Sequence, residues 1–129
     1  MESTVILFLD QDPAAFQGLD SRIEDDRTVF MRVDKSSEAL RMVQNEPIAL
    51  VVLDAESCSL PIEEIVPIIR GINRDIPIIV TCEHNTPDLE AQVRAQNIFY
   101  YHIKSFGISD LELAVRNALE KQRGKRPRS

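Results

Sequence analysis

The sequence predicts an α/β domain built on a doubly wound, five-stranded parallel sheet. Apolar runs such as Ile48 to Leu53 lack polar alternation, which is typical of strands that helices cover on both faces. Strand-like and helix-like segments alternate along the chain. A chain of 129 residues with 43% hydrophobic content fits one domain with one sizeable core. Right-handed crossovers between five such strands favour the order 2-1-3-4-5.

The chain begins with a strand, a helix and a second strand. The apolar run from Val5 to Leu9 predicts the first strand. Asp12 can cap the following helix and Pro13 can occupy its first turn, and we expect this helix to run to about Glu24. The β-branched and aromatic residues of Thr28 to Val33 predict the second strand.

The middle of the chain repeats this pattern. Ser36 opens a helix that Asn45-Glu46-Pro47 closes, directly before the buried third strand from Ile48 to Leu53. A loop from Ala55 to Pro61 then leads to an isoleucine-rich helix from about Ile62 to Asn73. This segment therefore contributes a central strand and two covering helices.

The last part of the chain supplies two strands and two helices. Ile76 to Val80 predicts the fourth strand, and Phe99 to Ile103 predicts the fifth. Thr86 followed by a proline indicates the start of a helix that runs to about Gln96. Ser109 to Glu112 matches a capping box and predicts the start of the last helix.

Four of the five strands end in a reactive residue: Asp10, Asp54, Thr81 and Lys104. Ligands of such sheets bind at the carboxyl ends of the strands, so we expect these residues to converge. Strands one and three are neighbours in the predicted order and lie about 4.8 Å apart, which brings Asp10 and Asp54 close together. Two close carboxylates repel unless a cation or proton intervenes. Mg2+ meets this need and also binds phosphate oxygens, which predicts a phosphoryl site.

Each of these residues also has an ordinary structural interpretation. An Asp after a strand is commonly a cap or turn residue, a Thr often ends a strand, and a Lys is often a surface residue. The order of all four at the ends of successive strands favours a shared site. His84 and His102 lack the spacing of metal ligands, and surface or packing roles are favoured for both.

Several segments resemble receiver domains of bacterial two-component response regulators, and the resemblance covers residues 4–121. The run from Val5 to Pro13 is similar to the family's first strand and acidic cluster. Val51 to Asp54 resembles its phosphoacceptor strand, and Ile78 to Cys82 resembles its switch-threonine strand. Tyr101 to Phe106 resembles the segment that carries the switch aromatic residue and the lysine.

The resemblance implies a signalling phosphoacceptor rather than an enzyme with a separate substrate. Asp54 would accept a phosphoryl group from a histidine kinase or phosphotransfer protein, and the domain would assist its own Mg2+-dependent phosphorylation and dephosphorylation. Asp10 would bind Mg2+, Lys104 and Thr81 would contact phosphoryl oxygens, and Tyr101 would change rotamer as Thr81 moves. The signal would pass to a downstream output domain or protein through a surface around the fourth and fifth helices and the fifth strand. A homodimer could form through the last helix.

Three positions depart from the family pattern. Gln11 stands where a second consecutive acid is usual, so it can offer Mg2+ only a neutral oxygen, and Mg2+ affinity should drop. Ser105 replaces a usual proline. The loop after Asp54 is longer than usual, and Glu56 within it is expected to offer its backbone carbonyl to Mg2+ and to bring another negative charge near the site.

These departures leave a second hypothesis open. The chain could be a pseudo-receiver, a protein-interaction module that works without phosphorylation. A flavodoxin-like cofactor binder is disfavoured because the chain has only four glycines and none forms a phosphate-cradling loop after the first strand.

Composition argues against two further classes of protein, those that bind nucleic acid and those that span a membrane. The net charge is −6, but five basic residues and no acid lie in the last nine positions, and subtracting them leaves residues 1–120 at −11. An acidic body argues against direct nucleic-acid binding. No apolar stretch is long enough to span a membrane, and the two cysteines fit a reducing compartment, so a cytoplasmic domain is expected. We assign residues 1–121 to the receiver domain and 122–129 to a basic tail or the start of a linker.

Overall fold

The computed structural model describes residues 3–124, and its five strands form one parallel sheet. Residues 125–129, which include most of the predicted tail, lie outside the described part of the chain. Each strand coincides with an apolar or β-branched run of the sequence. The strands are β1 (Thr4–Leu9), β2 (Thr28–Val33), β3 (Ile48–Asp54), β4 (Ile78–Cys82) and β5 (Tyr100–Ile103).

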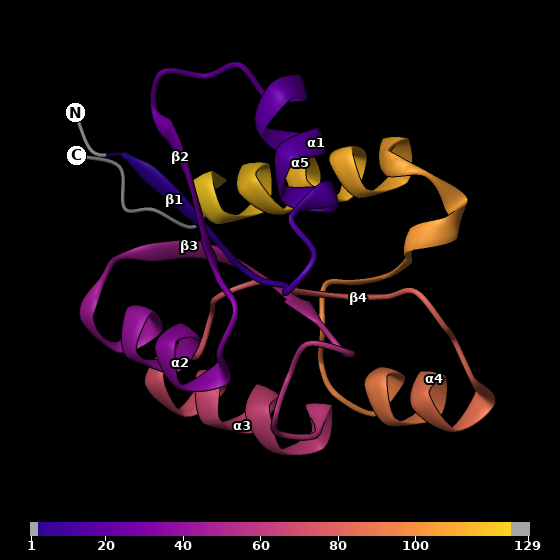
Figure 1. Ribbon diagram of the computed structural model, residues 1–129. Coiled ribbons are helices and arrows are strands. Elements are labelled where there is room, and N and C mark those ends of the chain that lie inside the picture. Colours follow the sequence, from indigo (N-terminus) through magenta and orange to yellow (C-terminus); the bar gives the residue numbers. More distant parts are fainter. Residues whose placement is uncertain (1–2, 125–129) are drawn as a thin grey trace.

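Five α-helices connect the strands, and a 3₁₀ turn named η1 (Lys104–Phe106) precedes the last helix. The helices are α1 (Ala14–Arg22), α2 (Ser36–Asn45), α3 (Ile62–Ile72), α4 (Pro87–Arg94) and α5 (Ile108–Gly124). As Figure 1 shows, α1 and α5 cover one face of the sheet, and α2, α3 and α4 cover the other. Within residues 3–124, every helix is too short or too polar to cross a bilayer.

The strand order is β2-β1-β3-β4-β5, as predicted, and all neighbouring strands are parallel. β3 lies at the centre of this order, and all seven of its residues are buried. β2 lies at an edge, and its burial is mixed. The chain reverses its winding direction between β1 and β3, and such a switch point leaves a crevice at the carboxyl ends of the two strands.

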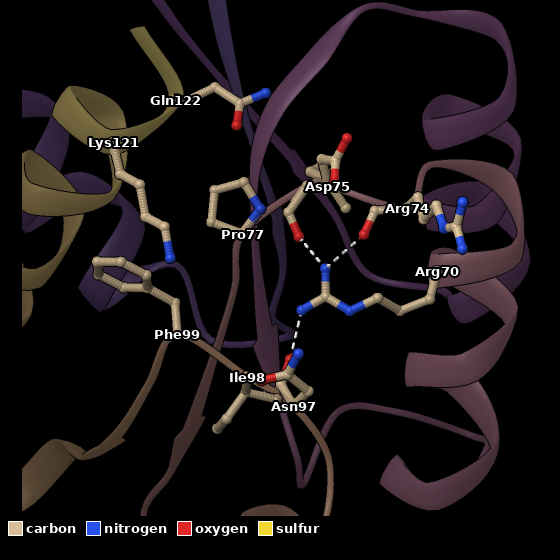
Figure 2. Close-up of a pocket in the computed structure, with 10 residues that line it drawn as sticks. Arg70, Arg74, Asp75, Pro77, Asn97, Ile98, Phe99, Lys121 and Gln122 are labelled. Atoms are coloured by element: carbon tan, nitrogen blue, oxygen red, sulfur yellow. Dashed lines mark hydrogen bonds between the residues drawn. The ribbon is translucent and has the colours of Figure 1, made fainter. Parts of the chain in front are cut away.

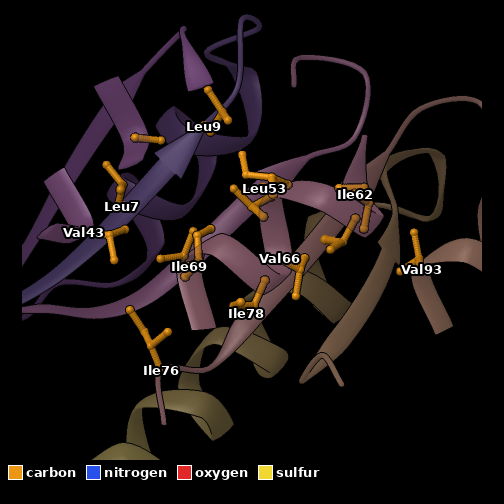
Figure 3. Close-up of a cluster of buried hydrophobic side chains, with 14 of the residues drawn as sticks. Leu7, Leu9, Val43, Leu53, Ile62, Val66, Ile69, Ile76, Ile78 and Val93 are labelled. Carbon is orange, nitrogen blue, oxygen red and sulfur yellow. The ribbon is translucent and has the colours of Figure 1, made fainter. Parts of the chain in front are cut away.

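β1 shows why both faces of the sheet need helices. Leu7 and Leu9 belong to the hydrophobic cluster under α2, α3 and α4, whereas Ile6 and Phe8 belong to the cluster under α1 and α5. All four side chains are fully buried. Successive side chains of a strand point to opposite faces, so an unbroken apolar run is buried on both sides. Figure 3 shows the first cluster, in which strand residues such as Leu53 lie against helix residues such as Ile69.

Two predicted helix starts are supported by capping contacts. Thr86 is the N-cap of α4, and its Oγ1 accepts a hydrogen bond of 3.1 Å from the amide of Leu89, which confirms the prediction. Asp12 likewise accepts a 3.0 Å hydrogen bond from the amide of Ala14, the first residue of α1. Pro13 is the flanking residue of α1 rather than part of its first turn. The helix therefore begins one residue later than expected.

The predicted capping box at Ser109 is wrong. α5 begins at Ile108, so Ser109 already lies inside the first turn of the helix. The turn η1 ends just before Gly107, which has a φ of 97°. Glycine adopts this left-handed region without steric cost, and the turn at Gly107 rather than a serine side chain sets the start of α5.

Candidate phosphoryl site

The sheet places all four reactive residues at its carboxyl edge. Asp54 is the last residue of β3 and pairs with Thr81 in the register of β3 and β4. Asp10 directly follows β1, the other neighbour of β3, and Lys104 directly follows β5. Residues that are far apart in the sequence therefore meet where four parallel strands end.

Lys104 connects the two carboxylates. Its Nζ lies 2.8 Å from Oδ2 of Asp10 and 3.0 Å from Oδ1 of Asp54. The Lys104 side chain is 14% exposed, and those of Asp10 and Asp54 are 3% and 4% exposed. Burying charges is costly unless they are paired, so this triad is stable only as a unit. One ammonium shared by two carboxylates leaves the site with a net negative charge.

Thr81 holds the same carboxylate from the neighbouring strand. Its Oγ1 donates a 3.1 Å hydrogen bond to Oδ1 of Asp54, and its side chain is buried. Its backbone carbonyl accepts a 2.8 Å hydrogen bond from the amide of Ala55. Thr81 therefore contacts both Asp54 and the residue that follows it.

Ser57 also belongs to the site, although no sequence pattern indicates it. Its Oγ donates a 2.7 Å hydrogen bond to Oδ2 of Asp54 and lies 3.5 Å from Oδ1 of Asp10. The amide of Gln11 donates a 2.9 Å hydrogen bond to the same Oγ. A serine within a polar loop has no pattern that sets it apart, and only its burial in the fold identifies it.

The proton affinities of the site reflect burial and pairing. Burial and the nearby Asp54 charge raise the pKa of Asp10, although hydrogen bonds from Lys104 and from the Asp12 amide oppose the shift. Burial alone would lower the pKa of Lys104, but hydrogen bonds to Asp10 and Asp54 outweigh it and the pKa is raised. The hydrogen bond from Lys104 therefore offsets the effect of burial on the pKa of Asp10 only in part.

Gln11 and Asp12 contact the site through their backbones. The Gln11 side chain is exposed, and its amide binds Ser57. The Asp12 amide donates a 2.9 Å hydrogen bond to Oδ1 of Asp10, while the Asp12 carboxylate binds at the start of α1. Asp12 lies one residue before the N-cap position, which Pro13 occupies, so the predicted N-cap at Asp12 is wrong although its carboxylate binds an amide there.

The Glu56 carboxylate was expected to bring a negative charge near the site, but it binds the loop after β4. The exposed carboxylate accepts hydrogen bonds from the amide of Glu83 at 2.7 Å and from that of His84 at 3.1 Å. It also lies 3.0 Å from Nδ1 of His84. The Glu56 side chain thus ties the loop after β3 to the loop after β4, and its charge is directed to amides rather than to Asp54.

Tyr101 is buried beneath the loop after β4. Its hydroxyl donates a hydrogen bond to Oδ1 of Asn85 and lies 3.0 Å from Sγ of Cys82. Burial and the Cys82 contact raise its pKa, so the hydroxyl remains protonated at neutral pH. Cys82 directly follows Thr81 in β4, so Tyr101 contacts both β4 and the loop that leaves it.

The histidines and cysteines have structural surroundings. His102 is buried and stacks on Tyr100, and burial lowers its pKa, whereas His84 is exposed on its loop. Cys58 is a free thiol whose Sγ contacts the Asp54 carbonyl, and burial followed by the Asp54 charge raises its pKa to about 12. Such a thiol is unreactive at neutral pH.

The donor set fits a small hard cation. Within residues 3–124, no group of three or more His, Cys, Asp or Glu side chains could hold a metal. Mg2+ needs fewer, because it commonly keeps several waters and binds one or two carboxylates together with phosphate oxygens. Asp10, Asp54 and the Ser57 hydroxyl supply side-chain oxygens at the site, and the negative net charge favours a cation.

Cavities lie at both edges of the sheet. A cavity of about 260 Å³ adjoins Lys104 at the carboxyl edge, lined among others by Asp12 and Glu83. Another, of about 160 Å³, lies where β4 and β5 begin (Figure 2). There the Arg70 guanidinium donates hydrogen bonds to the backbone carbonyls of Ile76 and Asn97. The first cavity shares Lys104 with the group of reactive residues described above, whereas the contacts in the second hold three segments together.

No protein-family model matches the chain, and no curated protein matches it in sequence. Solved structures do match. The signal receiver domain of an HD domain-containing protein from Pseudomonas fluorescens Pf-5 superposes with a TM-score of 0.84 at 21% identity, covering 100% of this chain and 96% of the other.

Two further structures agree with this match. A CheY-like response regulator receiver domain protein from Methanospirillum hungatei JF-1 has a TM-score of 0.79 at 16% identity, with 97% of this chain and 100% of the other covered. The beryllofluoride-activated NtrC4 receiver domain dimer has a TM-score of 0.79 at 17% identity, with 92% and 98% covered. The strand order, the two helical layers and these superpositions lead to one conclusion: the chain has the fold of response regulator receiver domains.

Proposed function

We propose that this domain is a signalling phosphoacceptor in which Asp54 takes a phosphoryl group from a phosphohistidine of a histidine kinase or phosphotransfer protein. One observation carries the proposal: the buried Asp54 carboxylate lies within 3.1 Å of both Thr81 Oγ1 and Lys104 Nζ. An aspartate with a purely structural role needs only enough hydrogen-bond donors to pair its carboxylate oxygens. This one is surrounded by the donors that a phosphoryl group on its oxygen would need.

The reaction requires little covalent chemistry from the protein. A carboxylate oxygen of Asp54 attacks phosphorus, the P–N bond of the donor breaks as the new O–P bond forms, and the electron pair leaves with the imidazole. Lys104 and Thr81 are placed to stabilise the charge on the phosphoryl oxygens, and Asp10 orients Lys104. Mg2+, when bound by Asp10, Asp54 and the Glu56 carbonyl, supplies further positive charge at the phosphoryl group.

Phosphorylation would be read out through Thr81 and Tyr101. A phosphoryl group on Asp54 competes for the Thr81 hydroxyl that now binds the carboxylate. Movement of Thr81 displaces the neighbouring Cys82, which contacts Tyr101, and Tyr101 in turn binds Asn85 of the loop after β4. The proposed result is a shift between two conformations of the surface formed by α4, β5 and α5.

The partner that distinguishes these conformations is an output domain or a separate protein. The similar Pseudomonas domain comes from an HD domain-containing protein, and the similar NtrC4 domain forms a dimer. By analogy with these two, an attached output domain and a homodimer are both compatible with our proposal.

Intact mass spectrometry of acidified samples tests the proposal. The wild type, Asp54→Ala and the control Asp12→Asn are incubated with acetyl phosphate, with and without Mg2+. We expect the wild type and Asp12→Asn to gain one phosphoryl group in the presence of Mg2+, and Asp54→Ala to gain none. Equal labelling of Asp54→Ala would contradict the proposal, because the phosphoryl group would then lie elsewhere.

A pseudo-receiver is the second candidate, and two observations favour it. Protein groups already contact every oxygen of the two carboxylates, with Lys104 on one side and Ser57 on the other. The second acid of the family pattern is absent at Gln11. A wild type that gains no phosphoryl group at any Mg2+ concentration would favour this candidate.

A further inference from the structure

Two bridges connect Asp10 and Asp54, and only one of them carries a charge. Lys104 Nζ contacts Oδ2 of Asp10 and Oδ1 of Asp54, as described above. Ser57 Oγ lies against the other pair of oxygens, 3.5 Å from Oδ1 of Asp10 and 2.7 Å from Oδ2 of Asp54. Three oxygens therefore converge away from Lys104, one from the end of β1 and two from the end of β3 and the turn after it.

The spacing of these three oxygens resembles part of a magnesium shell. Neighbouring ligands of an octahedral Mg2+, with bond lengths of 2.0–2.1 Å, are about 2.9 Å apart. The two distances from Ser57 Oγ to the carboxylates lie on either side of this value. A shared cation would bring Oδ1 of Asp10 closer to Ser57 Oγ than the present 3.5 Å.

The hydrogen bonds of Ser57 leave its oxygen available. A hydroxyl has one proton and two lone pairs. The proton is donated to Asp54 and one lone pair accepts the Gln11 amide, so the second lone pair is free for a cation. Ser57 is buried, and these two bonds fix the direction of that lone pair.

We infer that Ser57 Oγ is a direct ligand of the divalent cation at this site and supplies the side-chain oxygen that Gln11 does not. Serine and threonine hydroxyls bind Mg2+ in this way beside the phosphates of P-loop proteins. The inference rests on the proposed function only for the identity of the cation, because the oxygen cluster itself is independent of phosphorylation.

Mg2+ titration of the unphosphorylated protein tests the inference, with binding followed by amide chemical shifts of Asp10, Asp54 and Lys104 in NMR spectra. Ser57→Ala is compared with the wild type and with Ser59→Ala, a matched change in the same loop whose side chain is exposed. We expect Ser57→Ala to bind Mg2+ about tenfold more weakly and Ser59→Ala to match the wild type. Equal or tighter binding by a folded Ser57→Ala variant would overturn the inference, as would a wild type that binds no Mg2+.

A cysteine replacement separates direct ligation from an indirect effect on the loop. Thiolates prefer soft metals, so Ser57→Cys should bind Mg2+ more weakly than the wild type but Cd2+ at least tenfold more tightly. Ser59→Cys serves as the control, because it adds a thiol to the same loop and to the two native cysteines. No gain in Cd2+ affinity relative to Ser59→Cys would show that Ser57 does not touch the metal.

The outcomes for this inference and for the proposed function are distinct. Loss of labelling at Asp54 with normal, Ser57-dependent Mg2+ binding would remove the phosphoacceptor function and keep the ligand assignment. Labelling at Asp54 together with Mg2+ affinity that does not depend on Ser57 would keep the phosphoacceptor function and remove the ligand assignment.

Discussion

The two edges of the sheet both contain charged side chains that are at least partly buried, but they satisfy them differently. At the carboxyl edge, Asp10, Asp54 and Lys104 are paired with one another. At the amino edge, Arg70 binds backbone carbonyls of Ile76 and Asn97, which cannot change charge or rotamer (Figure 2). Side-chain partners can be displaced by a cation or a phosphoryl group, whereas backbone carbonyls packed beside the strands are fixed. The carboxyl edge can therefore exist in more than one state, and the amino edge holds the framework in place.

Removal of Lys104 should have the largest effect, because it leaves two buried carboxylates without their shared cation. We expect Lys104→Met to lose about 3–5 kcal/mol of unfolding free energy at pH 8. The loss should shrink as the pH falls. Lys104 lowers the pKa of Asp10, so without it this pKa rises further above its ordinary value of 3.8. The folded variant then takes up a proton at a pH where the unfolded chain does not, and its stability increases with acidification.

Urea unfolding at pH 8 and pH 5.5 measures this effect. The wild type provides the reference at each pH, and circular dichroism confirms that the variant is folded before urea is added. A deficit that is the same at both pH values would show that the lysine stabilises the edge through packing of its alkyl chain rather than through its charge.

Removal of Arg70 should lower the free energy of unfolding by less than removal of Lys104 does. This loss should not depend on pH between 5.5 and 8. Arg70→Met keeps most of the aliphatic packing but leaves the carbonyls of Ile76 and Asn97 without their donor, which we expect to cost about 2–3 kcal/mol. Neither carbonyl titrates, so the deficit should be equal at pH 5.5 and pH 8. Arg74→Met changes an exposed arginine at the same edge and should have little effect.

The same variant tests whether the two edges act independently. Arg70→Met should still gain a phosphoryl group from acetyl phosphate to the same extent as the wild type. Reduced labelling of a folded variant would mean that the amino edge controls the geometry of Asp54, and the distinction between a framework edge and a changeable edge would fail.

The two edges also differ in how much of their structure sequence patterns predict. The strand order and the meeting of Asp10, Asp54, Thr81 and Lys104 followed from apolar runs and from parallel-sheet geometry, because both depend on patterns that extend over whole strands. Ser57 could not be predicted, since its role depends on how one loop folds back over the carboxylates.

Other local features were missed for the same reason. Arg70 reads as an ordinary residue near the end of α3, and only the packing of three segments around it reveals its carbonyl partners. Ser109 matched a capping box, but Gly107 already determined where α5 begins. The charge of Glu56 was expected near Asp54, although the amides of the loop after β4 attract it instead. Contacts between loops leave little trace in sequence periodicity.

Glu56 allows the smallest and most selective test, because it lies at the carboxyl edge but binds backbone amides, as Arg70 binds backbone carbonyls. Burial would raise its pKa, but hydrogen bonds from the Glu83 amide, the His84 side chain and the His84 amide lower it below its ordinary value of 4.5. A lowered carboxylate pKa stabilises the fold above about pH 4.5, and this stabilisation is lost as the pH falls through the folded-state pKa.

Because the carboxylate is exposed, we expect Glu56→Gln to cost less than about 1 kcal/mol at pH 7 and nothing at pH 3. Thermal unfolding across this pH range measures the difference, with the exposed Glu120→Gln as control. If Glu56→Gln also leaves Mg2+ binding unchanged, a position at the carboxyl edge does not by itself make a charged side chain respond to a ligand. What decides the response is whether the charged side chain is paired with other side chains or with backbone groups.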